Sequence, residues 1–170
     1  MKFTYYGHSC FSVEINSKKL LFDPFITGNE LAKNIKLADI DADYILQSHG
    51  HADHIADCIS IAQATGAKVV CSWEIHEWLF KKGVNNTHPM NTGGGWDFDD
   101  FRVKCTAAQH SSGLPDGSYG GSPMGFIVCT EKILLLQRRH STDTGYATYS
   151  TMGKTKFCGV AHRRQFYNGL

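Results

Sequence analysis

Four side chains that can bind a metal ion lie within six residues, directly after an apolar run. The run covers residues 43–47 and is typical of a buried strand, so the four side chains that follow it lie at a strand end. They are His49, His51, Asp53 and His54. Alternate residues of an extended segment point to the same side, so His49 and His51 can bind one ion, and a turn over residues 50–53 directs the other two side chains towards a second ion.

This ligand set suits a divalent metal with catalytic chemistry. Such ions bind imidazole and carboxylate groups and keep one position open for water. Two neighbouring ions can share a hydroxide and stabilise both the attacking and the leaving oxygen of a hydrolysis reaction. The alternative is a set of surface histidines on a loop, which the regular spacing and the preceding strand disfavour.

The surrounding pattern predicts an α/β domain. Short aromatic and β-branched runs predict a meander of three strands, which ends at Asp23-Pro24 because proline cannot donate to a sheet. A polar loop or short helix is expected over residues 27–40. Helices are predicted over 57–65, stopped by Gly66, and over 74–82, capped by Gly83. The predicted strands cover residues 3–6, 10–15, 20–22, 43–47 and 68–71, and this alternation of strands and helices favours a layered α/β architecture.

The second half of the chain predicts mainly strands and loops. Residues 91–96 form a glycine-rich loop, which has no lysine and opens no helix, so it does not resemble a phosphate-binding loop. A strand, turn and strand are expected over 98–107, then a flexible loop over 113–123 and a strand over 125–130.

Other candidate site residues carry weaker signals. His110 follows an apolar strand, where a lone histidine is more often structural than a ligand. His8 and Asp23 could orient the ligating imidazoles or line the pocket, although ordinary turn and capping roles fit them equally well. Four further histidines have no partner at a useful spacing and are interpreted as structural or solvent-exposed: His76, His88, His140 and His162.

Composition narrows the class of protein. The 170 residues suffice for one compact domain, and a hydrophobic fraction of 42% predicts a packed core. The net charge of +1 gives no basic surface for nucleic acid. No signal peptide and no apolar stretch of membrane-spanning length is found, so no membrane contact is expected. Six scattered cysteines without a CxxC pair indicate reduced, mostly buried thiols and a cytoplasmic location.

Several motifs, taken together, resemble the metallo-β-lactamase superfamily, in particular a largely uncharacterised bacterial and archaeal group of metal-dependent hydrolases similar to the lactonase that opens ascorbate 6-phosphate. The motifs are Tyr6-Gly7-His8-Ser9-Cys10-Phe11, Leu21-Phe22-Asp23-Pro24-Phe25, Ser48-His49-Gly50-His51-Ala52-Asp53-His54 and His110-Ser111-Ser112. The resemblance covers about the first 131 residues. It implies a four-layer αββα sandwich with metals at one edge.

The resemblance also implies roles for the site residues. His49, His51 and His110 would hold the first metal, and Asp53 and His54 the second. Asp53 would also orient the nucleophilic water and accept its proton. The expected reaction is hydrolysis of a small-molecule ester, lactone, amide or phosphoester. Zinc is the default ion for this nitrogen and oxygen ligand set, and manganese, iron or nickel suit the same geometry.

The segment 132–170 departs from this pattern. Residues 1–131 carry 10 basic and 15 acidic groups, whereas 132–170 carry 7 and 1, so the net charge changes from −5 to +6. The Gly-Asp-Thr motif whose aspartate bridges both metals in the family is missing: Ser141-Thr142-Asp143-Thr144 lacks the glycine and follows Arg138-Arg139-His140 rather than a strand. The last family histidine is missing as well.

The genetic code suggests a cause for this departure. Leu135 to Thr144 can be back-translated so that reading from the second base gives Tyr-Tyr-Ser-Gly-Asp-Thr. We hypothesise one extra base near Leu134 or Leu135, in the gene or in its sequencing, which makes 132–170 an aberrant basic tail and leaves 1–131 as an incomplete hydrolase domain. The alternative function is then an inactive remnant that binds one metal. Its exposed sheet surface would favour a homo-oligomer.

Overall fold

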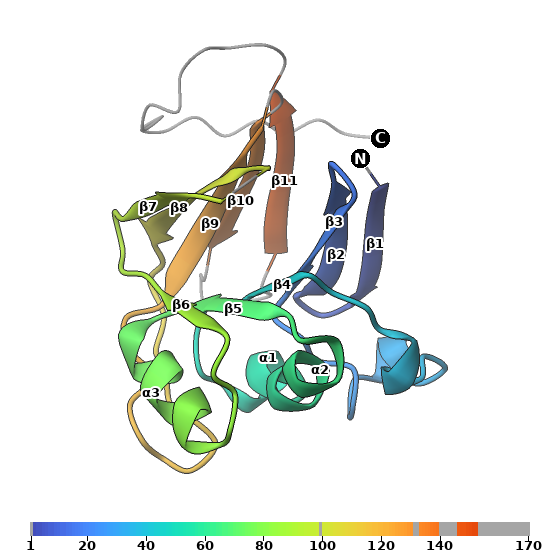
Figure 1. The fold of residues 1–170 in the computed structure, drawn as a ribbon, viewed down its shortest axis with the longest axis vertical. Coiled ribbons are helices and arrows are strands. Elements are labelled where there is room, and N and C mark those ends of the chain that lie inside the picture. Colours follow the sequence, from blue (N-terminus) through green and yellow to red (C-terminus); the bar gives the residue numbers. More distant parts are fainter. Residues whose placement is uncertain (1, 99, 131–132, 140–145, 153–170) are drawn as a thin grey trace.

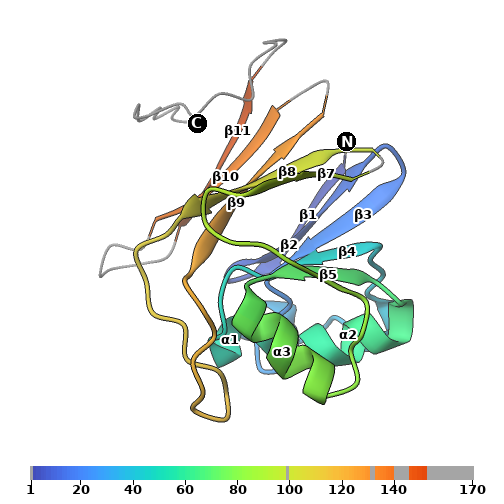
Figure 2. The same cartoon turned by 60° about the vertical axis from the view of Figure 1, so that its left-hand side comes forward.

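The computed structural model describes residues 2–98, 100–130, 133–139 and 146–152. Two β-sheets pack against each other, and the helices cover the outer face of only one of them (Figures 1 and 2). The α/β prediction is confirmed. The described residues form three layers in the order helices, sheet, sheet, and no helix among them covers the second sheet, so the predicted fourth layer is not seen in this part of the chain.

The first sheet has the order β1-β2-β3-β4-β5-β6. Strands β1, β2 and β3 pair antiparallel, and β3, β4, β5 and β6 pair parallel. The predicted meander and the two strands after it are therefore confirmed, and β6 is an addition. The strands are β1 (Lys2–Gly7), β2 (Cys10–Ile15), β3 (Lys18–Phe22), β4 (Tyr44–Leu46), β5 (Lys68–Cys71) and β6 (Thr87–Pro89).

The two predicted helices end within one residue of their predicted ends. Gly66 follows α2 in the left-handed conformation, and Gly83 takes a positive φ just beyond α3. Ser72 caps α3 by accepting a hydrogen bond from the N–H of Ile75, so this helix begins one residue before its predicted start. The helical elements are the 3-10 turns η1 (Glu30–Ala32) and η2 (Leu37–Asp39), and the helices α1 (Ala52–Ile55), α2 (Cys58–Thr65) and α3 (Trp73–Lys81).

The second sheet is antiparallel throughout, in the order β11-β10-β9-β8-β7. Its strands are β7 (Gly95–Asp97), β8 (Arg102–Ala107), β9 (Met124–Cys129), β10 (Ile133–Arg139) and β11 (Tyr146–Met152). Two expectations were wrong. The first strand of the predicted hairpin lies at Gly95–Asp97 and overlaps the end of the glycine-rich loop expected over 91–96. The chain also forms a strand before Ser141, because β10 runs to Arg139 and pairs with β9 and β11. Residues 140–145, which include the Ser141–Thr144 motif, lie outside the described residues, as do His162 and Cys158.

Two apolar cores hold these layers together. One lies between the helices and the first sheet, where Ile61, Ile75 and Leu79 pack on sheet residues such as Ile45. The other lies between the sheets and includes Phe126. No helix in the described part of the chain is long and apolar enough to cross a membrane.

Candidate metal centre

The side chains predicted to bind metal follow strand ends. Strand β4 ends at Leu46, and the chain then passes through His49 to His51, the N-cap residue of α1. Helix α1 was not predicted, and it carries Asp53 and His54 in its single turn. His110 comes from a distant part of the chain, on the loop after β8.

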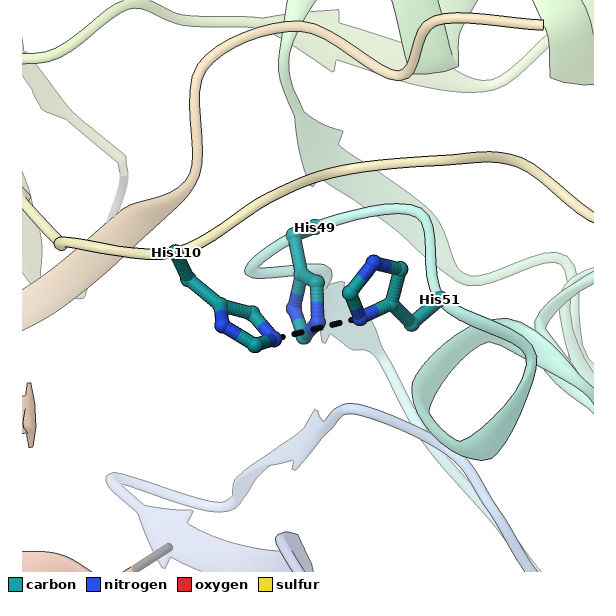
Figure 3. Close-up of side chains that lie close together, drawn as sticks. All are labelled: His49, His51 and His110. Carbon is teal, nitrogen blue, oxygen red and sulfur yellow. Dashed lines mark hydrogen bonds between the residues drawn. The ribbon is translucent and has the colours of Figure 1, made fainter. Parts of the chain in front are cut away.

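His49, His51 and His110 form a first cluster, shown in Figure 3. Their ring centroids are 4.6 to 4.8 Å apart, and His51 Nδ1 lies 3.1 Å from His110 Nε2. His49 is buried, whereas His110 is exposed, so the cluster has a closed side and an open side. An arrangement of three imidazoles with an open side is that of a catalytic rather than a structural metal site.

Two serine hydroxyl groups determine which ring nitrogen of His49 and of His51 can bind a metal ion. Ser48 Oγ lies 2.9 Å from His49 Nδ1, and Ser111 Oγ lies 3.2 Å from His51 Nε2. The opposite ring nitrogens, Nε2 of His49 and Nδ1 of His51, are then the atoms suited to bind an ion. The donor set therefore fits a divalent metal.

His8, Asp53 and His54 form a second cluster beside the first. His8 Nε2 lies 3.0 Å from Asp53 Oδ2 and 3.2 Å from His54 Nε2. The two clusters are adjacent, because the ring centroids of His49 and His54 are 4.3 Å apart. The structure thus brings together Asp53 and His54, as the predicted second site requires, and adds His8 to them.

Asp23 lies beneath both clusters and is almost fully buried. Its Oδ1 accepts hydrogen bonds from Ser48 N at 2.8 Å and Gln47 Nε2 at 3.4 Å. Its Oδ2 accepts from Ser48 Oγ at 2.7 Å and His54 Nδ1 at 3.1 Å. Asp23, His49 and His54 are also close enough to hold an ion. With four donors on its two oxygens, however, Asp23 is better suited to orient the histidines.

The loop that carries His110 is fixed by contacts that the sequence did not reveal. Gly50 donates its N–H to Ser112 Oγ at 3.1 Å, which joins this loop to the His49–His51 segment. Ser72, the cap of α3, donates to the Gly120 carbonyl at 2.7 Å. Gly121 has a φ of +79°, and a Cβ there would lie 2.7 Å from the Ser72 side chain. The expected flexible loop is thus tied to both α3 and the first cluster.

In the described part of the chain, His76, His88 and the buried thiol of Cys10 lie outside these clusters. His76 Nδ1 contacts Thr87 Oγ1 at 2.5 Å, and His88 packs against Trp96 and Phe98, where burial lowers its pKa. The structural interpretation of these two histidines is confirmed. Cys10 is buried, and this burial raises the pKa of its thiol to about 12. A protonated thiol is not a metal ligand.

Comparison with known proteins identifies the family. The β-lactamase superfamily domain matches residues 18–159. The chain belongs to the metallo-β-lactamase superfamily. Within it, the chain is 52% identical over 128 residues to a UPF0173 metal-dependent hydrolase of Methylacidiphilum infernorum, which covers 75% of this chain and 57% of that protein. A UPF0173 metal-dependent hydrolase of a Geobacillus species is 42% identical over 166 residues, which covers 95% of this chain and 71% of that protein.

The solved structure of a metallo hydrolase is also similar to this chain. Igni18, a metallo hydrolase from the hyperthermophilic archaeon Ignicoccus hospitalis, superposes with a TM-score of 0.66 at 33% identity, over 78% of this chain and 57% of that one. The predicted resemblance to the uncharacterised hydrolase group is therefore confirmed. The chain spans little more than half the length of the first of these relatives.

Proposed function

We propose that this chain carries the metal-binding part of a hydrolase that acts on a small-molecule ester, lactone, amide or phosphoester. The observation that carries the proposal is the pair of adjacent clusters, one of three histidines and one that contains a carboxylate. Two residues of each cluster lie in the loop after β4 and in α1, namely His49 and His51 of the first and Asp53 and His54 of the second. Relatives that are named metal-dependent hydrolases support it.

Two divalent ions fit the nitrogen and oxygen donors of the clusters, and zinc is the default choice, with manganese, iron or nickel as alternatives. Such ions lower the pKa of water to about 7 and polarise a carbonyl or phosphoryl oxygen. His49, His51 and His110 would hold the first ion, and Asp53 and His54 the second.

Side chains of this protein would orient the attacking water and the ligating histidines, and one of them would accept the proton of the water. The Asp53 side chain is half exposed, so its carboxylate is accessible to water and can orient an attacking water molecule and accept its proton. Asp23 and Ser48 hold the rings of His54 and His49 in fixed orientations. The net charge of −5 over residues 1–131 favours a small molecule over a nucleic acid as substrate. The buried thiols suit a reducing cytoplasm.

The second candidate is a remnant that binds a single ion and has no activity. It is favoured by the missing Gly-Asp-Thr motif, since Asp143 in the corresponding stretch is preceded by Thr142 instead of glycine. It would retain His49, His51 and His110 as ligands and would not hold the second ion.

Metal analysis and activity together separate the two candidates. The chain is purified, its bound metals are counted by plasma mass spectrometry, and chromogenic lactone, ester, amide and phosphodiester substrates are tested before and after chelation. Two ions and a chelator-sensitive hydrolysis that is lost in His51→Ala but kept in His88→Ala support the hydrolase. One ion without hydrolysis supports the remnant, and no bound metal refutes both.

A further inference from the structure

The turn between β1 and β2 places an imidazole nitrogen beside the Asp53 and His54 side chains of α1. His8 is the first residue after β1, and its Nε2 atom faces both Asp53 and His54. These three residues come from segments 45 residues apart in the sequence, so their meeting depends on the fold. Sequence reasoning left His8 between a pocket role and an ordinary turn role.

The spacing of the three donor atoms is that of ligands around one ion. His8 Nε2 lies 3.0 Å from Asp53 Oδ2 and 3.2 Å from His54 Nε2, and the last two atoms are 3.8 Å apart. The point equidistant from all three lies about 2.0 Å from each, which is the length of zinc bonds to imidazole nitrogen and carboxylate oxygen. The His8 and Asp53 side chains are 39% and 50% exposed, so a bound ion would remain open to water on one side.

Hydrogen bonding on the far side of His54 supports the same assignment. The Asp23 carboxylate can only accept, so His54 donates its Nδ1–H to Asp23. In the neutral ring Nε2 then carries a lone pair, and this lone pair faces the Asp53 carboxylate and His8 Nε2. The Asp53 carboxylate also presents only lone pairs, and His8 Nε2 does so in the tautomer that is protonated at Nδ1, so a cation fits the point between the three atoms.

The backbone holds His8 in this position. Its φ is +53°, a conformation that non-glycine residues seldom adopt, and Tyr5 donates its hydroxyl to the His8 carbonyl at 2.9 Å. Gly7 is closely packed, since a Cβ there would lie 2.5 Å from the Leu31 Cβ. A strained turn of this kind persists only where its surroundings fix it, and such turns gather at functional sites.

We propose that His8 is the third protein ligand of the second metal site, with Asp53 and His54. This inference rests on the proposed function only in requiring that the chain binds two ions. The competing interpretation is that His8 donates a hydrogen bond to one of these neighbours and takes no part in metal binding.

The test uses variants that spare the turn. His8→Asn removes the imidazole but tolerates the left-handed conformation, and His8→Gly removes both the side chain and the strain. His76→Ala is the matched control, a histidine removed from outside the site. For the full chain, the affinities of Zn²⁺ and Co²⁺ are measured by calorimetry, and the visible spectrum of bound Co²⁺ reports its coordination.

We expect both His8 variants to keep the first ion and to bind the second at least about 10-fold more weakly, since even neighbours of metal ligands affect affinity on this scale. The Co²⁺ spectrum of the second site should change, and added imidazole should restore binding in His8→Gly. Unchanged affinity for both ions in the two variants would overturn the proposal, as would a wild-type chain that binds fewer than two ions. Two ions without any hydrolysis would refute the proposed function and leave the role of His8 supported.

Discussion

Replacing Asp23 by asparagine tests how the site controls its histidines. The carboxylate is 5% exposed and accepts hydrogen bonds from Ser48 N, Ser48 Oγ, Gln47 Nε2 and His54 Nδ1. Asparagine has nearly the same shape but only one acceptor atom. Its oxygen can replace Oδ1, which receives the two nitrogen donors of Gln47 and Ser48. Its NH₂ group must then stand in place of Oδ2 and face Ser48 Oγ and His54 Nδ1.

The substitution reverses the hydrogen bond to His54. The serine hydroxyl can rotate and accept, but the imidazole can accept at Nδ1 only by moving its proton to Nε2. The nitrogen that faces the second cluster would then carry a hydrogen and no lone pair. We expect the second ion to bind about 10–100-fold more weakly, which is the usual loss when a partner of a ligating histidine is removed. The free energy of unfolding should fall by about 1.5–3 kcal/mol, the value of one hydrogen bond to a charged group.

Asp57→Asn provides the control. Asp57 is 4% exposed, and its Oδ2 accepts from the N–H groups of Ile26 and Thr27 at 2.6 and 2.8 Å. The oxygen of an asparagine can accept both bonds, so this variant makes the same chemical change without affecting a histidine. Calorimetric titration with Zn²⁺ measures the two affinities, and urea unfolding measures stability. The reasoning is refuted if folded Asp23→Asn binds both ions as the wild type does, or if Asp57→Asn loses the second ion equally.

Three further predictions concern the loop, the core and the gene. Ser112→Ala leaves the Gly50 N–H without its acceptor, so stability should fall by about 1–3 kcal/mol. The affinity for the first ion should fall below that of the wild type, whereas the affinity for the second should not change. A first-ion affinity equal to that of the wild type would contradict this. Burial raises the thiol pKa of Cys10 and of Cys105 from 9.0 to about 12, so the folded state keeps protons that the unfolded state releases. Stability should therefore fall by about 1.4 kcal/mol per pH unit per thiol above pH 9, and Cys105→Ala should reduce that slope; an unchanged slope in urea titrations would show the reasoning to be wrong. Sequencing of fresh source DNA across the codons for residues 130–137 should find one base fewer, and finding the sequence as given would reject the extra-base hypothesis.

Elements with strong local signals were predicted well. Gly66 and Gly83 ended the two longer helices as expected, because left-handed glycine at a helix end is a property of the chain itself. Helix α1 and strands β6 and β7 were not predicted at their positions, because their local sequence signals are weak. Helix α1 has four residues, too few for an apolar period, and each of the two strands has three. Their formation depends on pairing and packing with distant residues.

The residues of the candidate site also fall into those with a local sequence signal and those without one. His49, His51, Asp53 and His54 were recognised by spacing within one short segment, and their role as ligands stays a prediction. Ser112 and Ser72 were missed because each acts through a contact with a residue about 50 or 60 positions away. No sequence spacing encodes such a contact.

Strand direction explains why the distant groups meet. Strands β1 and β3 both pair antiparallel with β2, so they run the same way, and β4 is parallel to β3. The carboxyl ends of β1, β3 and β4 therefore lie at one edge of the sheet, where functional groups of α/β proteins gather. His8, Asp23 and His49 each lie at or just beyond one of these ends. The sequence predicted these strands but not their directions. Once the directions are known, His8 belongs to the same edge of the sheet as His49, so the topology supports the proposed role of His8 in addition to the distances.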